Sequence, residues 1–90
     1  MDSMDDSEVV MIPHDRIGVL IGRHGETKQG IEKFTETEIT VDSREGEVDI
    51  AAKGDPLKYW KAVKIVRAIA RGFSPEHALR LLSDEIVFEL

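Results

Sequence analysis

Residues 17–27 read IGVLIGRHGET, an apolar run followed by two glycines that enclose two polar residues. The branched apolar residues at positions 17, 20 and 21 have i, i+3, i+4 spacing, which predicts a short helix that ends at Gly22. A second helix is predicted from Glu26 to about Thr35. Only the four residues from Gly22 to Gly25 then remain to join the two helices, so the turn between them must be tight.

The two glycines of this turn avoid the steric clashes that side chains would cause where two helices meet closely. Without a Cβ atom, glycine adopts positive φ readily, so the helices can meet closely and the backbone of the turn stays accessible. The second helix presents unpaired N–H groups at its start, where the helix dipole favours an anion. We therefore expect a sugar-phosphate backbone to lie against Gly22 and Gly25, with donors from Arg23, His24 and Lys28. Arg23 can bind phosphate with two donors, whereas His24 is mostly neutral near pH 7.

Patterned segments on both sides of the two helices predict a small sheet and further helices. Apolar or alternating residues predict strands over 8–13, 38–42 and 47–52, the last two as a hairpin, with a further strand candidate at 86–90. Asp15 is the expected N-cap of the first helix. Asp55 and Pro56 predict the start of a long helix that runs to about Arg71. Ser74-Pro75-Glu76 predicts one more helix, which gives the order β-α-α-β-β-α followed by an extra helix.

In this context residues 17–27 resemble the signature of type I KH domains, an apolar I-G-x-x-I-G-x-x-G segment that precedes a helix. The resemblance implies an α+β fold: a three-stranded antiparallel sheet with three helices packed on one face, plus a C-terminal helical extension. It also implies binding of single-stranded RNA, because KH domains clamp four backbone nucleotides with this GXXG loop. Bases would enter a groove between the first two helices and the strand at 39–41.

The resemblance assigns individual residues to this groove. One wall would be Gly18 and Val19, the other Thr40 and Val41, with Arg44 on the neighbouring loop. The apolar residues beside them are expected to be core: Ile17, Leu20, Ile21 and Ile31. Two positions depart from the family pattern, since Lys28 replaces a commonly aliphatic residue and Glu36 a frequent glycine. Lys28 would either favour a phosphate contact or loosen the packing of the second helix.

Further segments resemble a narrower family, the archaeal KH proteins related to the eukaryotic Krr/Dim ribosome-assembly factors, which include the partner of the Nob endonuclease. The segments GETK at 25–28 and especially ARGFSPEHAL at 70–79 carry this resemblance. It implies ribosome biogenesis in the cytoplasm, with binding near the 3′ end of small-subunit ribosomal RNA. A ribosome-assembly endonuclease or a translation-initiation factor would be the protein partner.

Members of that family usually carry a second KH domain. We therefore expect residues 1–6 to be an acidic tail and residues 7–72 the KH domain. Residues 73–90 would form the C-terminal helix and a linker or strand leading toward a second KH domain absent from this chain. A single-domain relative is the alternative.

The charge distribution limits how this chain can bind a polyanion. The formal net charge is −6, but residues 9–82 hold eleven acids and twelve bases, which leaves a net of +1. The acidic charge is thus concentrated in the tails, so long-range attraction should be weak and a local site must supply the affinity. The absence of cysteine excludes disulfides and thiolate metal sites, and fits a reducing compartment. The sequence predicts neither a signal peptide nor a membrane span.

The long predicted helix offers a second surface. Its bases recur without an intervening acid from Asp55 to Glu76; they are Lys58, Lys61, Lys64, Arg67 and Arg71. A solvated polar face, a second RNA contact and a protein-docking surface all fit this pattern. Tyr59 and Trp60 are expected to pack against the sheet, although aromatic side chains also stack on bases.

We predict no catalytic residue, metal site or cofactor. The three histidines lack companions at metal-ligand spacing, and Gly22 to Lys28 lacks the Gly-Lys-Ser/Thr of a phosphate-binding P-loop. The alternative to an RNA-binding module is therefore also non-enzymatic. It is a protein-interaction adaptor with little RNA affinity, which docks assembly or initiation factors through the basic helix or the helix at 79–82.

Overall fold

Three strands and three helices follow one another in the predicted order in the computed structural model, which describes residues 7–80. In chain order they are β1 (Ser7–Met11), α1 (His14–Ile21), the 3-10 turn η1 (Arg23–Gly25), α2 (Glu26–Thr35), β2 (Thr37–Asp42), β3 (Glu47–Ala52) and α3 (Pro56–Ala70). Residues 75–80 are helical as well. The strand candidate at 86–90, and the end of the last predicted helix, lie outside the described residues.

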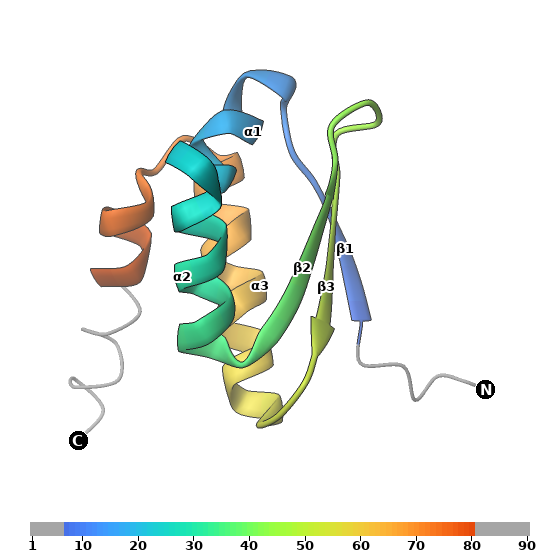
Figure 1. The fold of residues 1–90 in the computed structure, drawn as a ribbon, viewed down its shortest axis with the longest axis vertical. Coiled ribbons are helices and arrows are strands. Elements are labelled where there is room, and N and C mark those ends of the chain that lie inside the picture. Colours follow the sequence, from blue (N-terminus) through green and yellow to red (C-terminus); the bar gives the residue numbers. More distant parts are fainter. Residues whose placement is uncertain (1–6, 81–90) are drawn as a thin grey trace.

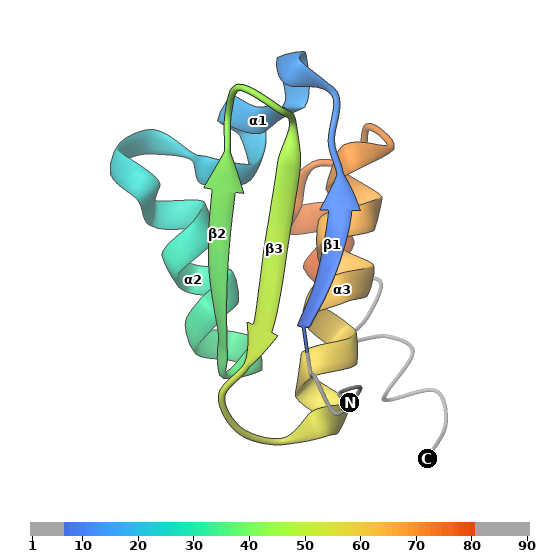
Figure 2. The ribbon, with the colours of Figure 1, turned by 90° about the vertical axis from the view of Figure 1, so that its right-hand side faces the viewer.

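The three strands form one antiparallel sheet in the order β1-β3-β2. The register aligns Val10 with Val48, and Val48 with Val41, across the sheet. All three helices cover the same face, with α2 beside the β2 edge and α3 beside β1 (Figures 1 and 2). The architecture is therefore the predicted two-layer α+β arrangement, and the outer edge of β2 borders α2.

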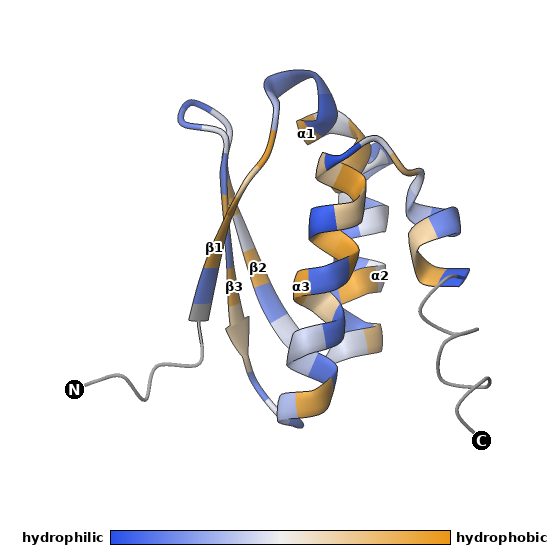
Figure 3. Ribbon diagram, turned by 180° about the vertical axis from the view of Figure 1, so that it is seen from behind, coloured by the Kyte–Doolittle hydropathy of each residue, from blue (hydrophilic) through white to orange (hydrophobic). Residues whose placement is uncertain are grey.

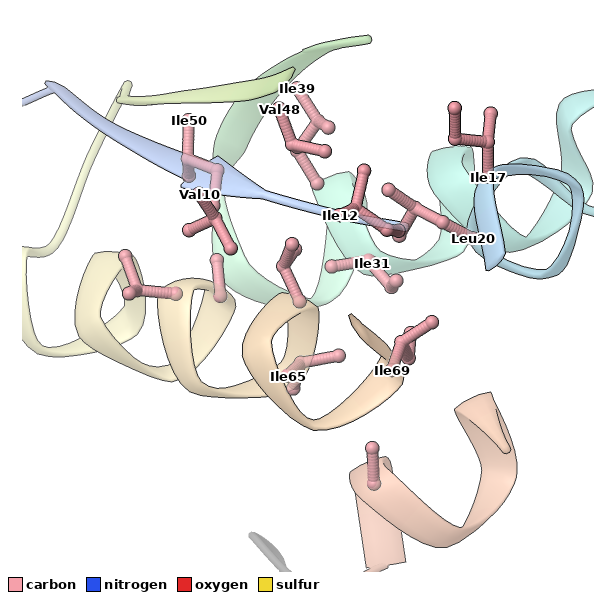
Figure 4. Close-up of a cluster of buried hydrophobic side chains, with 14 of the residues drawn as sticks. Val10, Ile12, Ile17, Leu20, Ile31, Ile39, Val48, Ile50, Ile65 and Ile69 are labelled. Atoms are coloured by element: carbon pink, nitrogen blue, oxygen red, sulfur yellow. The ribbon is translucent and has the colours of Figure 1, made fainter. Parts of the chain in front are cut away.

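The core lies between the sheet and the helices. Strand residues such as Val48 and Ile50 point toward α3, and Ile65 and Ile69 of that helix belong to the same buried cluster (Figure 4). Ile17, Leu20 and Ile31 are buried as predicted, and Ile21 is half-buried against the same cluster. Burial of each such side chain is worth about 1.5–3 kcal/mol, so α1 and α2, which hold the turn between them, are anchored by their apolar faces.

Most helix boundaries follow the signals in the sequence. Asp55 is the N-cap of α3 and accepts a hydrogen bond from the Leu57 N–H at 2.9 Å, with Pro56 at the first helical position. The expectation for Asp15 was wrong: α1 begins at His14 with Pro13 as N-cap, and Asp15 lies in the first turn instead. An acid in this place still interacts favourably with the helix dipole.

The expectation that Trp60 packs against the sheet was also wrong. Tyr59 is 5% exposed and belongs to the core, whereas Trp60 is 49% exposed. Consecutive residues of an α-helix differ by 100° around the axis, so only one member of the pair can face the sheet. The Trp60 ring meets the Tyr59 ring edge-on, with centroids 5.4 Å apart. The outer face of α3 thus mixes this aromatic ring with basic side chains. Hydrophilic and hydrophobic residues accordingly alternate along the α3 ribbon (Figure 3).

Candidate nucleic-acid interface

The turn between α1 and α2 requires glycine at its first position. Gly22 has φ 77° and ψ 179°, a combination that is essentially restricted to glycine. A Cβ atom at this position would overlap the Thr27 side chain and lie 2.9 Å from the Thr27 backbone nitrogen. Gly25 also has positive φ, at 78°, and His24 between them has φ 56°. The sequence predicts the conformation of the two glycines but gives no sign of the left-handed histidine.

This turn leaves the start of α2 open. Gly25 is the N-cap of α2, so no side-chain oxygen accepts from the amides of the first turn. The Glu26 N–H bonds back to the Arg23 carbonyl, and the next two amides, of Thr27 and Lys28, lie in the first turn of α2, where amides generally lack a helical acceptor. Arg23 and His24 are both exposed and form no ion pair or side-chain hydrogen bond with residues 7–80. The helix dipole and the adjacent guanidinium therefore create an accessible site for an anion.

Lys28 points away from this turn, toward β2. Its Nζ donates to the Ile39 carbonyl at 3.2 Å and to Glu32 Oε2 at 3.3 Å. The same Glu32 oxygen accepts from the Ile39 N–H at 2.8 Å. The Lys28 ammonium thus joins α2 to β2 and is not directed at the glycine turn, where a phosphate contact was predicted. Glu32 was not among the predicted residues, although its i+4 spacing from Lys28 is a usable signal.

The predicted groove residues separate into two faces of the sheet. Val41 is half-buried and lies on the face that packs against the helices, as does Ile39. Thr40 is exposed, and because side chains alternate along a strand, it points from the opposite face. On the other side, Val19 is half-buried and Gly18 exposed. Val19 and Val41 therefore both pack against the core between the sheet and the helices, and Gly18 lies exposed on α1. The Thr40 side chain points from the other face of the sheet and does not join them.

Arg44 lies in the short β2–β3 hairpin, toward the same end of the molecule as the glycine turn (Figure 2). Its carbonyl contacts His14 Nε2 at 3.1 Å, and Asp42 Oδ1 accepts from the N–H groups of Arg44 and Glu45 at 3.0 and 3.1 Å. These bonds hold the hairpin backbone against the start of α1. The Arg44 side chain is exposed on this loop, so it stays a candidate for contact with an anion.

At the opposite end of α2, which we call the closed end, the C-cap residue Glu36 is hydrogen-bonded to neighbouring segments. Glu36 has φ 54°, and its carbonyl accepts from the Lys53 N–H at 3.0 Å. Its carboxylate accepts from Lys58 Nζ at 2.8 Å and from the Asp55 N–H at 3.4 Å. The hydrogen bond from Lys58 lowers the pKa of the Glu36 carboxyl below its ordinary 4.5, and the carboxylate in turn raises the pKa of Lys58.

The basic residues of α3 fall into two groups. Lys58 pairs with Glu36, and Arg67 pairs with Glu8 at 3.4 Å. The remaining three, Lys61, Lys64 and Arg71, form no ion pair within residues 7–80. Of the two groups, the second presents uncompensated charge to a partner, beside the exposed and uncharged ring of Trp60.

Arg16 has a structural role that the sequence did not reveal. Its Nε donates to the Ile69 carbonyl at 2.8 Å, and its Nη2 donates to the Phe73 carbonyl at 2.7 Å. These carbonyls lie at and just beyond the end of α3, and that of Ile69 also accepts from the Gly72 N–H at 3.1 Å. Arg16 therefore fixes α1 to the end of α3, a contact between residues more than fifty positions apart that no local pattern predicts.

An apolar pocket of about 410 Å³ lies between α2 and the helical residues 75–80. Its lining includes Ile31, Phe34, Pro75 and Leu79.

In the described part of the chain, no cluster of three or more potential ligands could hold a metal ion, and none of the helices is long and apolar enough to span a bilayer.

Comparisons with known proteins agree with this geometry. The sequence profile of the KH domain matches residues 7–68. A KH domain-containing protein of Methanocaldococcus jannaschii is 50% identical over 86 residues, which cover 92% of this chain and 37% of that protein.

Two solved structures from Pyrococcus horikoshii are also similar. The crystal structure of Dim2p has a TM-score of 0.80 and 59% identity, over 84% of this chain and 48% of that one. A chain in the crystal structure of an a/eIF2alpha–aDim2p–rRNA complex has a TM-score of 0.82 and 56% identity, over 90% and 48%. The present chain thus spans less than half the length of these relatives.

Proposed function

Since this chain belongs to the KH domain family, we propose that it is a single-stranded RNA-binding module that acts in small-subunit ribosomal RNA processing and ribosome assembly. The observation that carries the proposal is the exposed turn from Gly22 to Gly25, which opens onto the uncapped start of α2. A phosphate at this turn would accept from the Thr27 and Lys28 amides and from Arg23. Bases would then lie beside Val19 and Val41.

The ribosomal part of the proposal rests on the relatives. A similar chain was crystallised in a complex with rRNA and a/eIF2alpha, so small-subunit rRNA is the proposed ligand and an initiation factor or a ribosome-assembly endonuclease the proposed partner. Because archaeal rRNA matures in the cytoplasm, the proposal places the protein there. We further propose that residues 7–72 are the RNA-binding unit, and that residues 73–90 connect it to a second KH domain.

Charge reversal in the turn tests this function. We expect Arg23→Asp with His24→Asp to weaken binding of a labelled single-stranded RNA by at least about tenfold, because two anions would face the phosphates. Both side chains are exposed, so the circular dichroism spectrum and thermal midpoint should change little. Lys33→Asp is the control for Arg23→Asp, since it makes the same change of charge at an exposed position nearer the other end of α2. Unchanged RNA affinity in the double variant would refute the proposal.

A protein-interaction adaptor is the second candidate, and the outer face of α3 favours it. Leu57 and Trp60 are 72% and 49% exposed, next to the unpaired Lys61 and Lys64. Buried aromatic residues contribute much of the binding energy at protein interfaces. An exposed tryptophan beside two lysines therefore suits an acidic partner with an apolar patch.

Lys61→Glu with Lys64→Glu tests the adaptor. If this surface docks a protein, the variant should lose capture of archaeal initiation factor 2 alpha while keeping its affinity for RNA. Undiminished capture would exclude this face of α3 as the contact.

A further inference from the structure

At the outer edge of β2, the backbone groups of the central residue, Ile39, already have hydrogen-bond partners. The Ile39 N–H and C=O both bond to side chains of α2, so they point away from β3. Backbone groups alternate between the two sides of a strand, so the same groups of Thr37 and Val41 also point to this outer edge. These are the backbone donors and acceptors that the outer edge of β2 can offer to a ligand.

Glu32 and Lys28 close a compact ring around Ile39. Glu32 Oε2 accepts from the Ile39 N–H at 2.8 Å and from Lys28 Nζ at 3.3 Å, while Lys28 donates to the Ile39 carbonyl at 3.2 Å. The two side chains are only 22% and 28% exposed. Hydrogen bonds to charged groups are stronger than neutral ones, and these are also shielded from water. The ring is therefore a favourable arrangement that a ligand must disrupt to reach Ile39.

The chemistry of this ring matches that of a nucleobase. Unpaired bases are recognised through hydrogen bonds to their Watson–Crick edges, where a ring nitrogen and an exocyclic group supply an adjacent acceptor and donor. Glu32 supplies the acceptor and Lys28 the donor to the same two backbone groups of Ile39. A base that bound there would have to replace both bonds, and it would gain no additional ones.

We propose that Glu32, held by Lys28, is an affinity-determining residue of the groove that competes with a base for the Ile39 N–H and C=O. This inference rests on the proposed RNA-binding function and deepens it. RNA bound through the glycine turn alone leaves the ring intact, whereas RNA that also uses the β2 edge must turn Glu32 out. Affinity in the intact domain is thus lower than the turn and groove would otherwise give.

The test is Glu32→Ala, measured by fluorescence anisotropy with a labelled eight-nucleotide RNA of mixed sequence. We expect binding about fivefold tighter than wild type, a ratio that corresponds to about one net hydrogen bond. Glu32→Gln is the first control, because it removes the charge but keeps an oxygen that can accept from Ile39. Glu38→Ala is the second, because it removes an exposed carboxylate on the same strand. If the affinity depends on whether Glu32 bonds to the Ile39 N–H, and not on its charge, each control variant should tighten RNA binding by less than about twofold.

A second variant covers the case in which Glu32→Ala fails to fold. Lys28→Gln replaces the ammonium that donates to the Ile39 carbonyl by a shorter, neutral side chain. Because a positive charge is lost, a purely electrostatic view expects weaker RNA binding. The competition proposed here expects binding equal to or tighter than wild type. In wild type, the Ile39 amide should shift in NMR spectra when RNA is added.

The outcomes separate this inference from the function on which it rests. If wild type binds RNA but Glu32→Ala binds no tighter, or Glu32→Gln and Glu38→Ala gain as much, the competition is refuted and the proposed function stands. If Lys28→Gln binds more weakly and the wild-type Ile39 amide does not shift, the competition is also refuted. If neither wild type nor Glu32→Ala binds RNA, both proposals fall.

Discussion

The two ends of α2 both pass through backbone with positive φ, yet they differ in what their polar groups contact. At the start, Gly25 supplies no side-chain cap, and the side chains of Arg23 and His24 form no ion pair or hydrogen bond within residues 7–80. At the end, Glu36 binds Lys58 and the Asp55 amide, and its carbonyl accepts from Lys53. The side chain at the end of α2 is thus hydrogen-bonded within the chain, whereas the side chains at its start are not.

This contrast shows how the same backbone conformation serves two purposes. Glu36 stands where KH domains often have glycine, and its left-handed backbone is retained because several contacts hold it there. Gly22 has no such freedom of replacement, since Thr27 occupies the space of a Cβ atom. Substitutions at the closed end should therefore change stability alone, and those at the open end should change RNA binding.

The largest effect is expected from Gly22→Ala. Its φ and ψ are close to glycine-only, and the new Cβ would overlap Thr27, so the free energy of unfolding should fall by about 2–4 kcal/mol. Chemical denaturation measures this. Gly18→Ala is the control, because nothing lies within 4 Å of its virtual Cβ and alanine favours the helix by about 0.5–1 kcal/mol. Equal stability of the two variants would contradict the proposed geometry of the turn.

A smaller effect is expected from Arg23→Ala, which removes one phosphate contact and leaves the fold intact. With two or three phosphates contacted, the log–log salt dependence of wild-type affinity should have a slope of about −1.4 to −2.1. The variant should lose about 0.7 from the magnitude of that slope. Lys58→Ala, at the closed end, should leave the slope unchanged. A slope that is the same in Arg23→Ala and wild type would show that Arg23 does not contact phosphate.

The closed end should respond in stability only, and modestly. Glu36→Ala loses the contacts with Lys58 and Asp55 but keeps the strain of positive φ, whereas Glu36→Gly loses the contacts and relieves the strain. The thermal midpoint should therefore be lowest for Glu36→Ala, with Glu36→Gly between it and wild type. RNA affinity should be the same in all three. The reverse order of the two variants would mean that the backbone at position 36 is not strained.

The smallest effect is a pH dependence at the same residue. The folded state lowers the pKa of Glu36, so its contribution to stability is fully present above about pH 4.5 and is lost as pH falls through the lowered value. The difference in thermal midpoint between wild type and Glu36→Gln should therefore be largest near neutral pH and disappear as the pH falls through the lowered pKa. A difference that grows on acidification would contradict the sign of this shift.

Much of the fold follows from local signals. The glycines of the turn, the Asp55 cap and the alternation in both hairpin strands each act over a few residues, so the element order could be predicted. Alternation along the strand also predicts that Thr40 and Val41 point to opposite faces of the sheet, although the family resemblance placed both on one wall of the groove. The bonds of Arg16 to α3 and of Lys28 to Ile39 join distant segments, and only the packed structure reveals them.

Trp60 illustrates a different limit. Apolar character alone does not tell which of two adjacent aromatic residues faces the sheet, because that depends on the rotation of α3 set by the whole core. The exposed ring gives α3 a second candidate surface, distinct from the glycine turn. Any test of RNA binding must therefore distinguish the two surfaces.

The most direct measurement is an NMR titration of the ¹⁵N-labelled chain with single-stranded RNA. If amides at the open start of α2 receive a phosphate, the largest shifts should fall on residues 22–28, and the Thr27 and Lys28 amides should move downfield. Shifts concentrated on the outer face of α3 or on residues 75–80, with residues 22–28 unchanged, would contradict the account.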